Sequence, residues 1–164
     1  MSPRLLVADS GPLIALARLG LLALPMRLFA EVLVTATVWD EVTGSPERNE
    51  HADLQLARRH GLLAVVEDPS LVPAAFNDPR LDDGERSALA LSLARDCDVL
   101  IDERRGRLAA EAAGLNVVGT LGLLVRARQL GLVGPVRPLA ERLLNGGYHL
   151  SQSLVDRALM SLGE

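Results

Sequence analysis

The sequence predicts an α/β fold in which helices cover a parallel sheet, and three observations support this prediction. Short apolar runs recur along the chain, and the segments between them have helical spacing. The runs are continuously apolar rather than alternating, as expected of strands that are covered on both faces. The chain has 164 residues, of which 49% are hydrophobic and 23% charged, which suits one globular domain with its own core.

Five strands are expected from the apolar runs. These runs are residues 5–8, 32–34, 62–66, 99–101 and 117–118. The segments between them are long enough for crossover connections, which favours parallel pairing.

Helices are expected between these strands and after the last one. Pro12 suits the first turn of a helix, and Gly20 interrupts the segment that Pro12 begins. Leu89 and Leu93 lie four residues apart, as on one face of a helix, and Gly114 is typical of the position after a helix end. The expected helices are residues 12–28 as two short helices, a short helix around Trp39, and residues 82–95, 104–113, 120–130, 138–144 and 151–162.

The composition excludes several classes of protein. The net charge is −4, so no overall positive field attracts nucleic acid, and any polyanion must be bound locally. All 17 basic residues are arginine, which excludes mechanisms that need a Schiff-base or P-loop lysine. Cys97 is the single cysteine, which excludes an internal disulfide, and we expect it to be buried. No apolar stretch reaches the ~18 residues of a membrane span, and Asp9 interrupts the first apolar run, so we expect a cytoplasmic protein without a membrane partner.

Three acidic residues directly follow strands of the expected sheet. Asp9 follows the first strand, and Asp102 and Glu103 follow the fourth. In open α/β sheets the ligand site lies at the carboxyl ends of the strands, so these side chains are candidates for a functional site. A structural explanation is equally good for Asp9 alone, because Asp-Ser-Gly-Pro is also favourable turn chemistry.

Two further acidic residues have an ordinary structural explanation. Glu41 lies on a short helix, where a solvated surface acid is the common case. Glu85 and Asp82 fit the N3 and N-cap positions of a capping box. However, Gly84 is a poor helix former, and a glycine beside an acid indicates close approach by another group.

Five short segments occur in a specific order, and the first four of them carry these acids. They are Ala8–Ile14, Val38–Val42, Leu81–Arg86, Leu100–Arg107 and Val118–Gly122. Together they resemble the motifs of the PIN-domain nucleases, and most closely those of uncharacterised prokaryotic PIN-like proteins related to VapC-type toxins. The resemblance spans residues 4–130, and the ordered set is far more specific than any one segment.

The resemblance implies a three-layer α/β/α fold with a parallel five-stranded sheet in the order 3-2-1-4-5 and a helical C-terminal segment. It implies one PIN-like domain over residues 1–164, with a core at residues 4–130 and a C-terminal helical extension at residues 135–162. It also implies an acidic pocket at the carboxyl edge of the sheet. Matched motif by motif, the catalytic acids are Asp9, Glu41, Glu85 and Asp102.

Two features depart from the family pattern. The small hydroxyl residue that often follows the first acid by two positions is Gly11 here, so a supporting hydrogen bond comes from Ser10 or is absent. The fourth acid is ambiguous, because an ungapped count from Glu85 places it on Glu103. We take Asp102 as the fourth acid, and Glu103 as a second ligand or a supporting residue.

A cluster of carboxylates favours a divalent cation, because like charges a few ångströms apart raise one another's pKa values. Oxygen-only ligands suit Mg²⁺ or Mn²⁺. The expected metal ligands are Asp9, Glu85, Asp102 and Glu103, and Glu41 is expected to orient or deprotonate the attacking water. The expected reaction is hydrolysis of an RNA phosphodiester bond.

Arg104, Arg105 and Arg107 begin the helix after the fourth strand, where guanidinium groups can bind RNA phosphates that flank the scissile bond. A solvated helix face, or pairing with acids such as Glu103 and Glu111, explains these residues equally well. Aromatic residues make up 2% of the chain, so base stacking is not the main mode of recognition.

The resemblance also implies partners. Besides the RNA substrate, it implies a homodimer and, for toxin-like members, a small antitoxin protein whose peptide blocks the acidic pocket. The apolar residues Leu154, Leu159 and Leu162 either cover the sheet or form a subunit contact, and core packing is the better explanation.

Two other functions compete with a metal-dependent ribonuclease. One is a catalytically silent PIN-like scaffold that binds RNA or a protein partner, which the departures at Gly11 and Glu85 favour. The other is a receiver or phosphotransfer domain, but such sites need a lysine, and this chain has none. A phosphatase of the haloacid-dehalogenase type needs a second acid two residues after Asp9, where this chain has Gly11.

Overall fold

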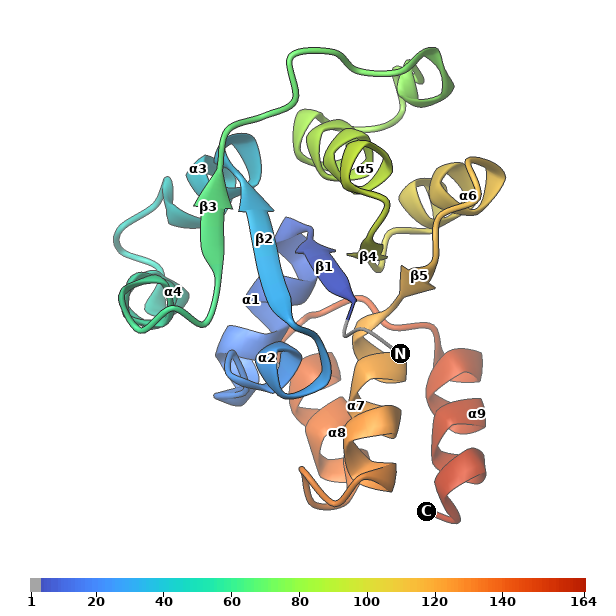
Figure 1. Ribbon diagram of the computed structural model, residues 1–164. Helices are drawn as coiled ribbons and strands as arrows, with labels where there is room; N and C mark the ends of the chain where they lie inside the picture. The colour runs from blue at the N-terminus through green and yellow to red at the C-terminus, as the bar shows by residue number, and fades with distance from the viewer. Residues whose placement is uncertain (1–3) are drawn as a thin grey trace.

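The computed structural model describes residues 4–164, in which five strands form one all-parallel sheet in the order β3-β2-β1-β4-β5 (Figure 1). The strands are β1 (Leu5–Ala8), β2 (Glu31–Thr35), β3 (Ala64–Val66), β4 (Asp98–Leu100) and β5 (Val117–Val118). The expected α/β class and strand order are therefore confirmed.

Helices surround the sheet (Figure 1). They are α1 (Ser10–Leu19), α2 (Leu24–Leu28), α3 (Ala36–Thr43), α4 (Asn49–Arg59), α5 (Asp83–Arg95), α6 (Arg104–Ala112), α7 (Thr120–Gln129), α8 (Val136–Asn145) and α9 (Gln152–Leu162), with a 3-10 helix η1 (Ala74–Phe76). Of these, α4 and η1 were not among the expected helices. Within residues 4–164, none of the helices has both the length and the apolar composition that crossing a membrane requires.

Apolar side chains cover both faces of the sheet, because successive side chains of a strand point to opposite faces. In and just after β4, Leu100 belongs to the larger core, which includes successive residues of β1 and β2 together with residues of α1, α5 and α7. Val99 and Ile101 belong to the smaller core, which includes residues of α5 and α6. Cys97, just before β4, is buried as expected. Helices on both faces give the three layers that the resemblance implied.

The order of the strands reverses direction between β1 and β4. From β1 the chain proceeds to β2 and β3 on one side, whereas β4 and β5 lie on the other side. The backbone N–H of Asp9 donates to the carbonyl oxygen of Leu100 at 2.9 Å, which holds the ends of the two central strands together. In open α/β sheets, ligands bind at such a switch point, outside the carboxyl ends of the strands. Asp9 and Asp102 follow the carboxyl ends of β1 and β4, so both lie at this switch point.

The third strand is shorter than expected, because Leu62 and Leu63 form the bend that connects the end of α4 to β3. Gly61 adopts a left-handed conformation with a φ of 72°. The backbone N–H of Leu62 then donates to the carbonyl oxygen of Ala57 at 2.9 Å, a bond that closes the helix end. Only residues 64–66 pair with β2.

The C-terminal helices pack together, and α7 contacts α1, α8 and α9. α8 begins at Val136, two residues before the expected start, because the Glu164 carboxylate accepts hydrogen bonds from the backbone N–H groups of Val136 and Arg137 at 2.7 and 3.0 Å. In α9, Leu159 is buried in the core, whereas Leu154 is 38% exposed. Core packing therefore explains Leu159 but not Leu154.

Candidate active site

Asp9 is a buried carboxylate at the junction of β1 and α1. The residue is 5% exposed, and its Oδ1 has no hydrogen-bond partner among residues 4–164. Burial raises the pKa of Asp9 to about 7, and a hydrogen bond from the backbone of Ser10 opposes this rise. Three neighbouring carboxylates raise the pKa further: Asp82, Glu85 and Glu41. Asp9 therefore lies in a negative field, with one oxygen that no described protein group satisfies.

Glu41 extends from α3 toward the carboxyl edge of the sheet, and its carboxylate lies against the backbone of α5. A Cβ atom on Gly84 would lie 2.7 Å from Glu41 Oε1, so a larger residue there would displace the carboxylate. Burial raises the pKa of Glu41, and the charge of Asp82 adds to the rise. Hydrogen bonds from the Ser10 side chain and the Gly84 backbone lower it. Gly84 thus allows the close approach that its position beside an acid indicated.

Glu85 is buried at the start of α5, where it forms the expected capping box. Its backbone N–H donates to Asp82 Oδ1 at 2.7 Å, and its Oε2 accepts from the backbone N–H of Asp82 at 2.9 Å. Its Oε1 faces α6, where a Cβ on Gly106 would lie 3.4 Å away. Burial raises the pKa of Glu85, and the Asp82 hydrogen bond opposes the rise. The charges of Asp82, Glu103 and Glu41 add to it. Capping uses only Oε2, so the structural and functional explanations are compatible.

Asp102 is oriented by three hydrogen-bond donors at the end of β4. The backbone N–H of Thr120 donates to Oδ1 at 2.7 Å, and the Thr120 hydroxyl donates to Oδ2 at 2.6 Å. Thr120 is the first residue of α7, so the helix start fixes this carboxylate. The hydroxyl of Tyr148, between α8 and α9, also donates to Oδ2. A second lone pair on Oδ1 is left for a ligand.

The Tyr148 hydroxyl lies in the space beside Gly11, where a Cβ atom would be 3.3 Å from Tyr148 Oη. The Ser10 side chain lies beside Glu41, whose pKa it lowers, and it does not bond to Asp102. Burial raises the pKa of Tyr148, and the charge of Asp102 raises it further, so the hydroxyl remains a donor. Support for Asp102 thus comes from a residue outside the motif that contains Gly11.

The structure brings Asp9, Glu41 and Glu85 to one edge of the sheet, close enough for their charges to act on one another. Asp102 lies next to these three acids, because Tyr148 links them. The Tyr148 hydroxyl donates to Asp102, and the charge of Asp9 raises the pKa of Tyr148. As placed, residues 4–164 contain no group of three or more His, Cys, Asp or Glu side chains arranged to hold a metal ion. A cation would therefore have to draw these carboxylates closer together.

The acid that competes with Asp102 for the fourth position is exposed. Glu103 is the N-cap residue of α6, with no side-chain capping bond. Its charge nevertheless raises the pKa of Glu85. Asp102 is the more rigidly oriented of the two acids.

The three predicted RNA-binding arginines lie at the start of α6, beside these acids. Arg104 and Arg105 are exposed, and Arg107 is half-buried. A Cβ atom on Gly119 would lie 3.1 Å from Arg107 Nη1 and 3.2 Å from Asp102 Oδ1, so both side chains border the same short backbone segment. Within residues 4–164 the three arginines form no ion pair, which leaves a phosphate-binding rim or a solvated helix face as their explanation.

Thr120 and Tyr148 were not predicted as site residues. Thr120 lies in the fifth motif segment, which singled out its position but not its role. Tyr148 is the single tyrosine and lies 46 residues from Asp102, and no spacing rule connects the two. The one signal in the sequence was Gly11, because a glycine at this position leaves room for a side chain from elsewhere in the chain.

Comparison with known proteins gives a family match and similar folds. The family described as "DUF3368: PIN domain" matches residues 5–164. Among curated proteins, none matches this sequence. The structure is similar to that of a PilT N-terminus domain protein, SSO1118, from the hyperthermophilic archaeon Sulfolobus solfataricus P2, at 14% identity and a TM-score of 0.56, covering 75% of this chain and 92% of that one. It is also similar to PAE2754 from Pyrobaculum aerophilum, at 16% identity and a TM-score of 0.55, covering 76% and 89%.

Proposed function

The chain belongs to the PIN-domain family, and from this premise we propose that it is a metal-dependent ribonuclease that hydrolyses RNA phosphodiester bonds. PIN domains are generally nucleases and typically use divalent metal ions. The choice of RNA as substrate, and of Mg²⁺ or Mn²⁺ as the ion, is the proposed part.

The observation that carries the proposal is the buried Oδ1 of Asp9, which has no hydrogen-bond partner among residues 4–164. A buried carboxylate oxygen without a donor is costly, and nearby acids increase the cost. A cation at this position would satisfy the oxygen and neutralise the field of Asp82, Glu85 and Glu41. The position next to Asp9 Oδ1 therefore suits the divalent cation that a metal-dependent nuclease requires.

The donor set fits Mg²⁺ or Mn²⁺, because every candidate ligand is a carboxylate oxygen. Asp9, Glu85 and Asp102 would hold the ion, with Glu103 as a further ligand or a supporting residue. Bound there, the ion would acidify a water molecule and stabilise negative charge on the phosphate oxygens.

The residues of the chain have distinct roles in this proposal. Glu41 orients the attacking water or accepts its proton, and its raised pKa brings its basicity closer to neutral pH. Thr120 and Tyr148 keep Asp102 in one orientation. Arg104, Arg105 and Arg107 bind RNA phosphates beside the bond that is cut.

The direct test is RNA cleavage by the Asp9→Asn variant with EDTA, Mg²⁺ or Mn²⁺. We expect metal-dependent cleavage by the wild type and a loss of at least about a hundredfold in the variant. Asp53→Asn is the matched control, because Asp53 is an exposed residue of α4 with the same side-chain chemistry. Cleavage that persists in EDTA, or that Asp9→Asn leaves intact, would exclude this mechanism.

A catalytically silent PIN-like scaffold remains the second candidate, and one observation favours it. Residues 4–164 place no three metal-ligating side chains at coordination spacing. Calorimetric titration with Mn²⁺, in the presence of an uncleaved RNA oligonucleotide, separates the two candidates. Heat that saturates with Mn²⁺ and disappears in Asp9→Asn supports the nuclease, whereas no divalent binding supports the scaffold.

We further propose that the nuclease acts as the toxin of a toxin-antitoxin pair and that it is a homodimer. Induced expression in a bacterial host should then arrest growth, and Asp9→Asn should remove the arrest. Co-expression of a short neighbouring reading frame, the candidate antitoxin, should restore growth. Light scattering that gives a monomer mass at micromolar concentration would exclude the homodimer.

A further inference from the structure

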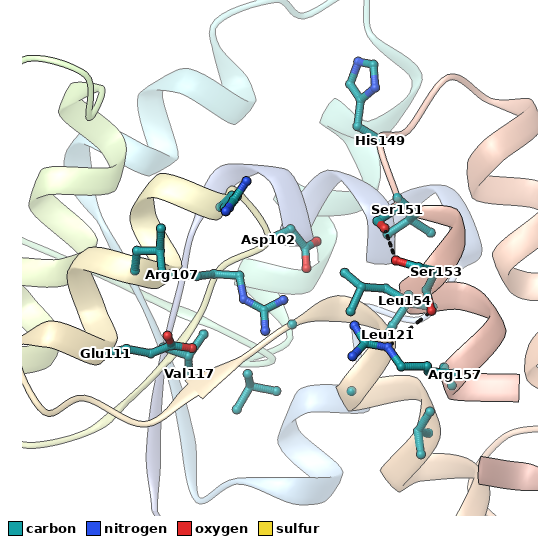
Figure 2. Close-up of a pocket in the computed structure, with 18 of the residues that line it drawn as sticks. Asp102, Arg107, Glu111, Val117, Leu121, His149, Ser151, Ser153, Leu154 and Arg157 are labelled. Atoms are coloured by element: carbon teal, nitrogen blue, oxygen red, sulfur yellow. Dashed lines mark hydrogen bonds between the residues drawn. The ribbon is translucent and has the colours of Figure 1, made fainter. Parts of the chain in front are cut away.

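A groove of about 1060 Å³ opens beside Asp102, between α6 and β5 on one side and α7 and α9 on the other (Figure 2). Small-molecule sites usually have volumes of about 300–1,000 Å³, so this groove can take a larger ligand. Its far wall is built by the C-terminal helix α9, whereas the acids described above come from the sheet and helices nearer the N-terminus. The groove thus extends the candidate active site toward the C-terminal helices.

The groove carries positive charge on a chain whose net charge is −4. Four arginines and two carboxylates line it: Arg104, Arg107, Arg126, Arg157, Asp102 and Glu111. Within residues 4–164, none of the four arginines forms an ion pair. Guanidinium groups gathered without carboxylate partners indicate a site for an anionic ligand.

Two of these arginines come from opposite walls. Figure 2 shows Arg107 from α6 and Arg157 from α9 extending toward each other across the space beside Asp102. Arg157 Nε donates to the backbone oxygen of Ser153 in a long bond of 3.4 Å. Apolar side chains also line the groove, and two of them are unusually exposed: Leu108 is 53% exposed and Leu154 is 38% exposed.

We propose that this arginine groove binds the single-stranded RNA segment that continues from the scissile bond. The inference rests on the proposed ribonuclease function and extends it to the substrate-binding surface. The four arginines bind successive phosphates from both walls, and the apolar lining contacts riboses and base faces. Arg126 and Arg157 thereby become substrate-binding residues. No Phe, Tyr or Trp lines the groove, so the affinity is mainly electrostatic and depends steeply on salt.

Charge and continuity favour RNA over the other occupants of such a groove. A second copy of this chain, packed symmetrically, would bring the same unpaired arginines together, which is unfavourable. An acidic amphipathic peptide would match the arginines and the apolar lining. However, the groove is continuous with Asp102, one of the acids placed to act on a phosphodiester, and a polynucleotide brings a phosphate to both places.

The test is the salt dependence of RNA binding, measured by fluorescence anisotropy on a labelled 12-nucleotide RNA in EDTA. Each phosphate contact to a single strand contributes about 0.7 to the slope of log K against log salt. Arg126→Gln/Arg157→Gln should therefore lower the slope by about 1.4 and weaken binding at least tenfold at low salt. Glu111→Gln should strengthen binding, which a folding defect does not do.

Arg27→Gln/Arg59→Gln is the matched control, since it removes the same charge from exposed positions on α2 and α4. The slope should stay at the wild-type value in this control. An equal effect in both double variants, or an unchanged slope in Arg126→Gln/Arg157→Gln, overturns the proposal. A second result also overturns the proposal: a labelled Glu- and Leu-rich peptide binds Arg126→Gln/Arg157→Gln more weakly than the wild type, while the salt slope of RNA binding is unchanged. Because binding is measured without a metal, failure of the proposed nuclease mechanism in the cleavage assay and failure of the groove to bind RNA are separate results.

Discussion

The hydroxyl of Tyr148 donates a hydrogen bond to Asp102 and lies where a side chain on Gly11 would otherwise point. These residues belong to distant parts of the chain, the loop after α8 and the first turn of α1. The tyrosine therefore supplies a donor that the glycine cannot. We expect this exchange to be visible in the kinetics of RNA cleavage.

Tyr148→Phe removes one of the three donors that orient Asp102, while keeping the ring that packs against the core. A hydrogen bond to a charged group contributes about 1.5–3 kcal/mol, so we expect kcat to fall by about tenfold or more. Single-turnover cleavage of a defined RNA at saturating protein measures this change. KM should change much less, because the tyrosine is not proposed to touch RNA.

Gly11→Ser is expected to rescue Tyr148→Phe, because the serine side chain would enter the space that the tyrosine hydroxyl has left. In the wild-type background the same substitution crowds Tyr148 Oη, which lies 3.3 Å from the added Cβ position, and should lower activity. Thermal unfolding of all variants controls for stability. Equal stabilities without any rescue would mean that the hydroxyl does not position Asp102.

The stability of the metal-free protein should fall as the pH rises from about 4 to about 7. Asp9 has a pKa of about 7 in the folded state, whereas an unfolded chain releases this proton near a pKa of about 3.9. Between these values the folded state binds more protons, so the free energy of unfolding decreases with pH. Asp9→Asn cannot ionise, so it should exceed the wild type in stability at pH 7 by on the order of a few kcal/mol and match it near pH 4. Urea denaturation in EDTA at several pH values measures the difference, and parallel pH profiles would contradict it.

Divalent metal should reverse this loss of stability. A ligand that binds only the folded state stabilises it by about 2.7 kcal/mol at a hundredfold excess over its Kd. Adding Mn²⁺ at pH 7 should therefore raise the Tm of the wild type, and chelation should restore the lower value. Asp9→Asn should show no such shift, whereas Asp53→Asn should shift like the wild type. Equal shifts in all three proteins would show that Mn²⁺ binds elsewhere.

Gly84→Ala should separate activity from stability. Alanine is favoured over glycine within a helix by about 1 kcal/mol, so the substitution in α5 should not destabilise the fold. Its methyl group would occupy the position of the Glu41 carboxylate, which must move away. We expect RNA cleavage to fall at least tenfold while the Tm is kept. Gly134→Ala is the control, since a Cβ there meets nothing within 4 Å. Wild-type cleavage by Gly84→Ala would remove Glu41 from the mechanism.

Much of the architecture could be predicted because apolar runs and helical spacing are local signals. The strand order came from the resemblance, which the PIN-domain match and the structure confirm. The third strand was predicted too long because Leu62 and Leu63 are as apolar as strand residues, although they lie in the bend that follows the left-handed Gly61.

The candidate site was less predictable than the fold. Acids that directly follow strands, such as Asp9 and Asp102, can be placed by topology alone. The role of Tyr148 depends on how the C-terminal helices pack, which no local pattern encodes. Arg126 and Arg157 were not singled out for the same reason, because they line one groove only once α7 and α9 have packed together.

The loop between α8 and α9 makes the orientation of Asp102 depend on the packing of the C-terminal helices, because this loop carries the tyrosine donor. The same helices shape the groove, since α9 provides one of its walls. Loosening α8 and α9 from α7 would therefore take one of three donors from Asp102 and widen the groove, while every strand of the sheet stayed paired.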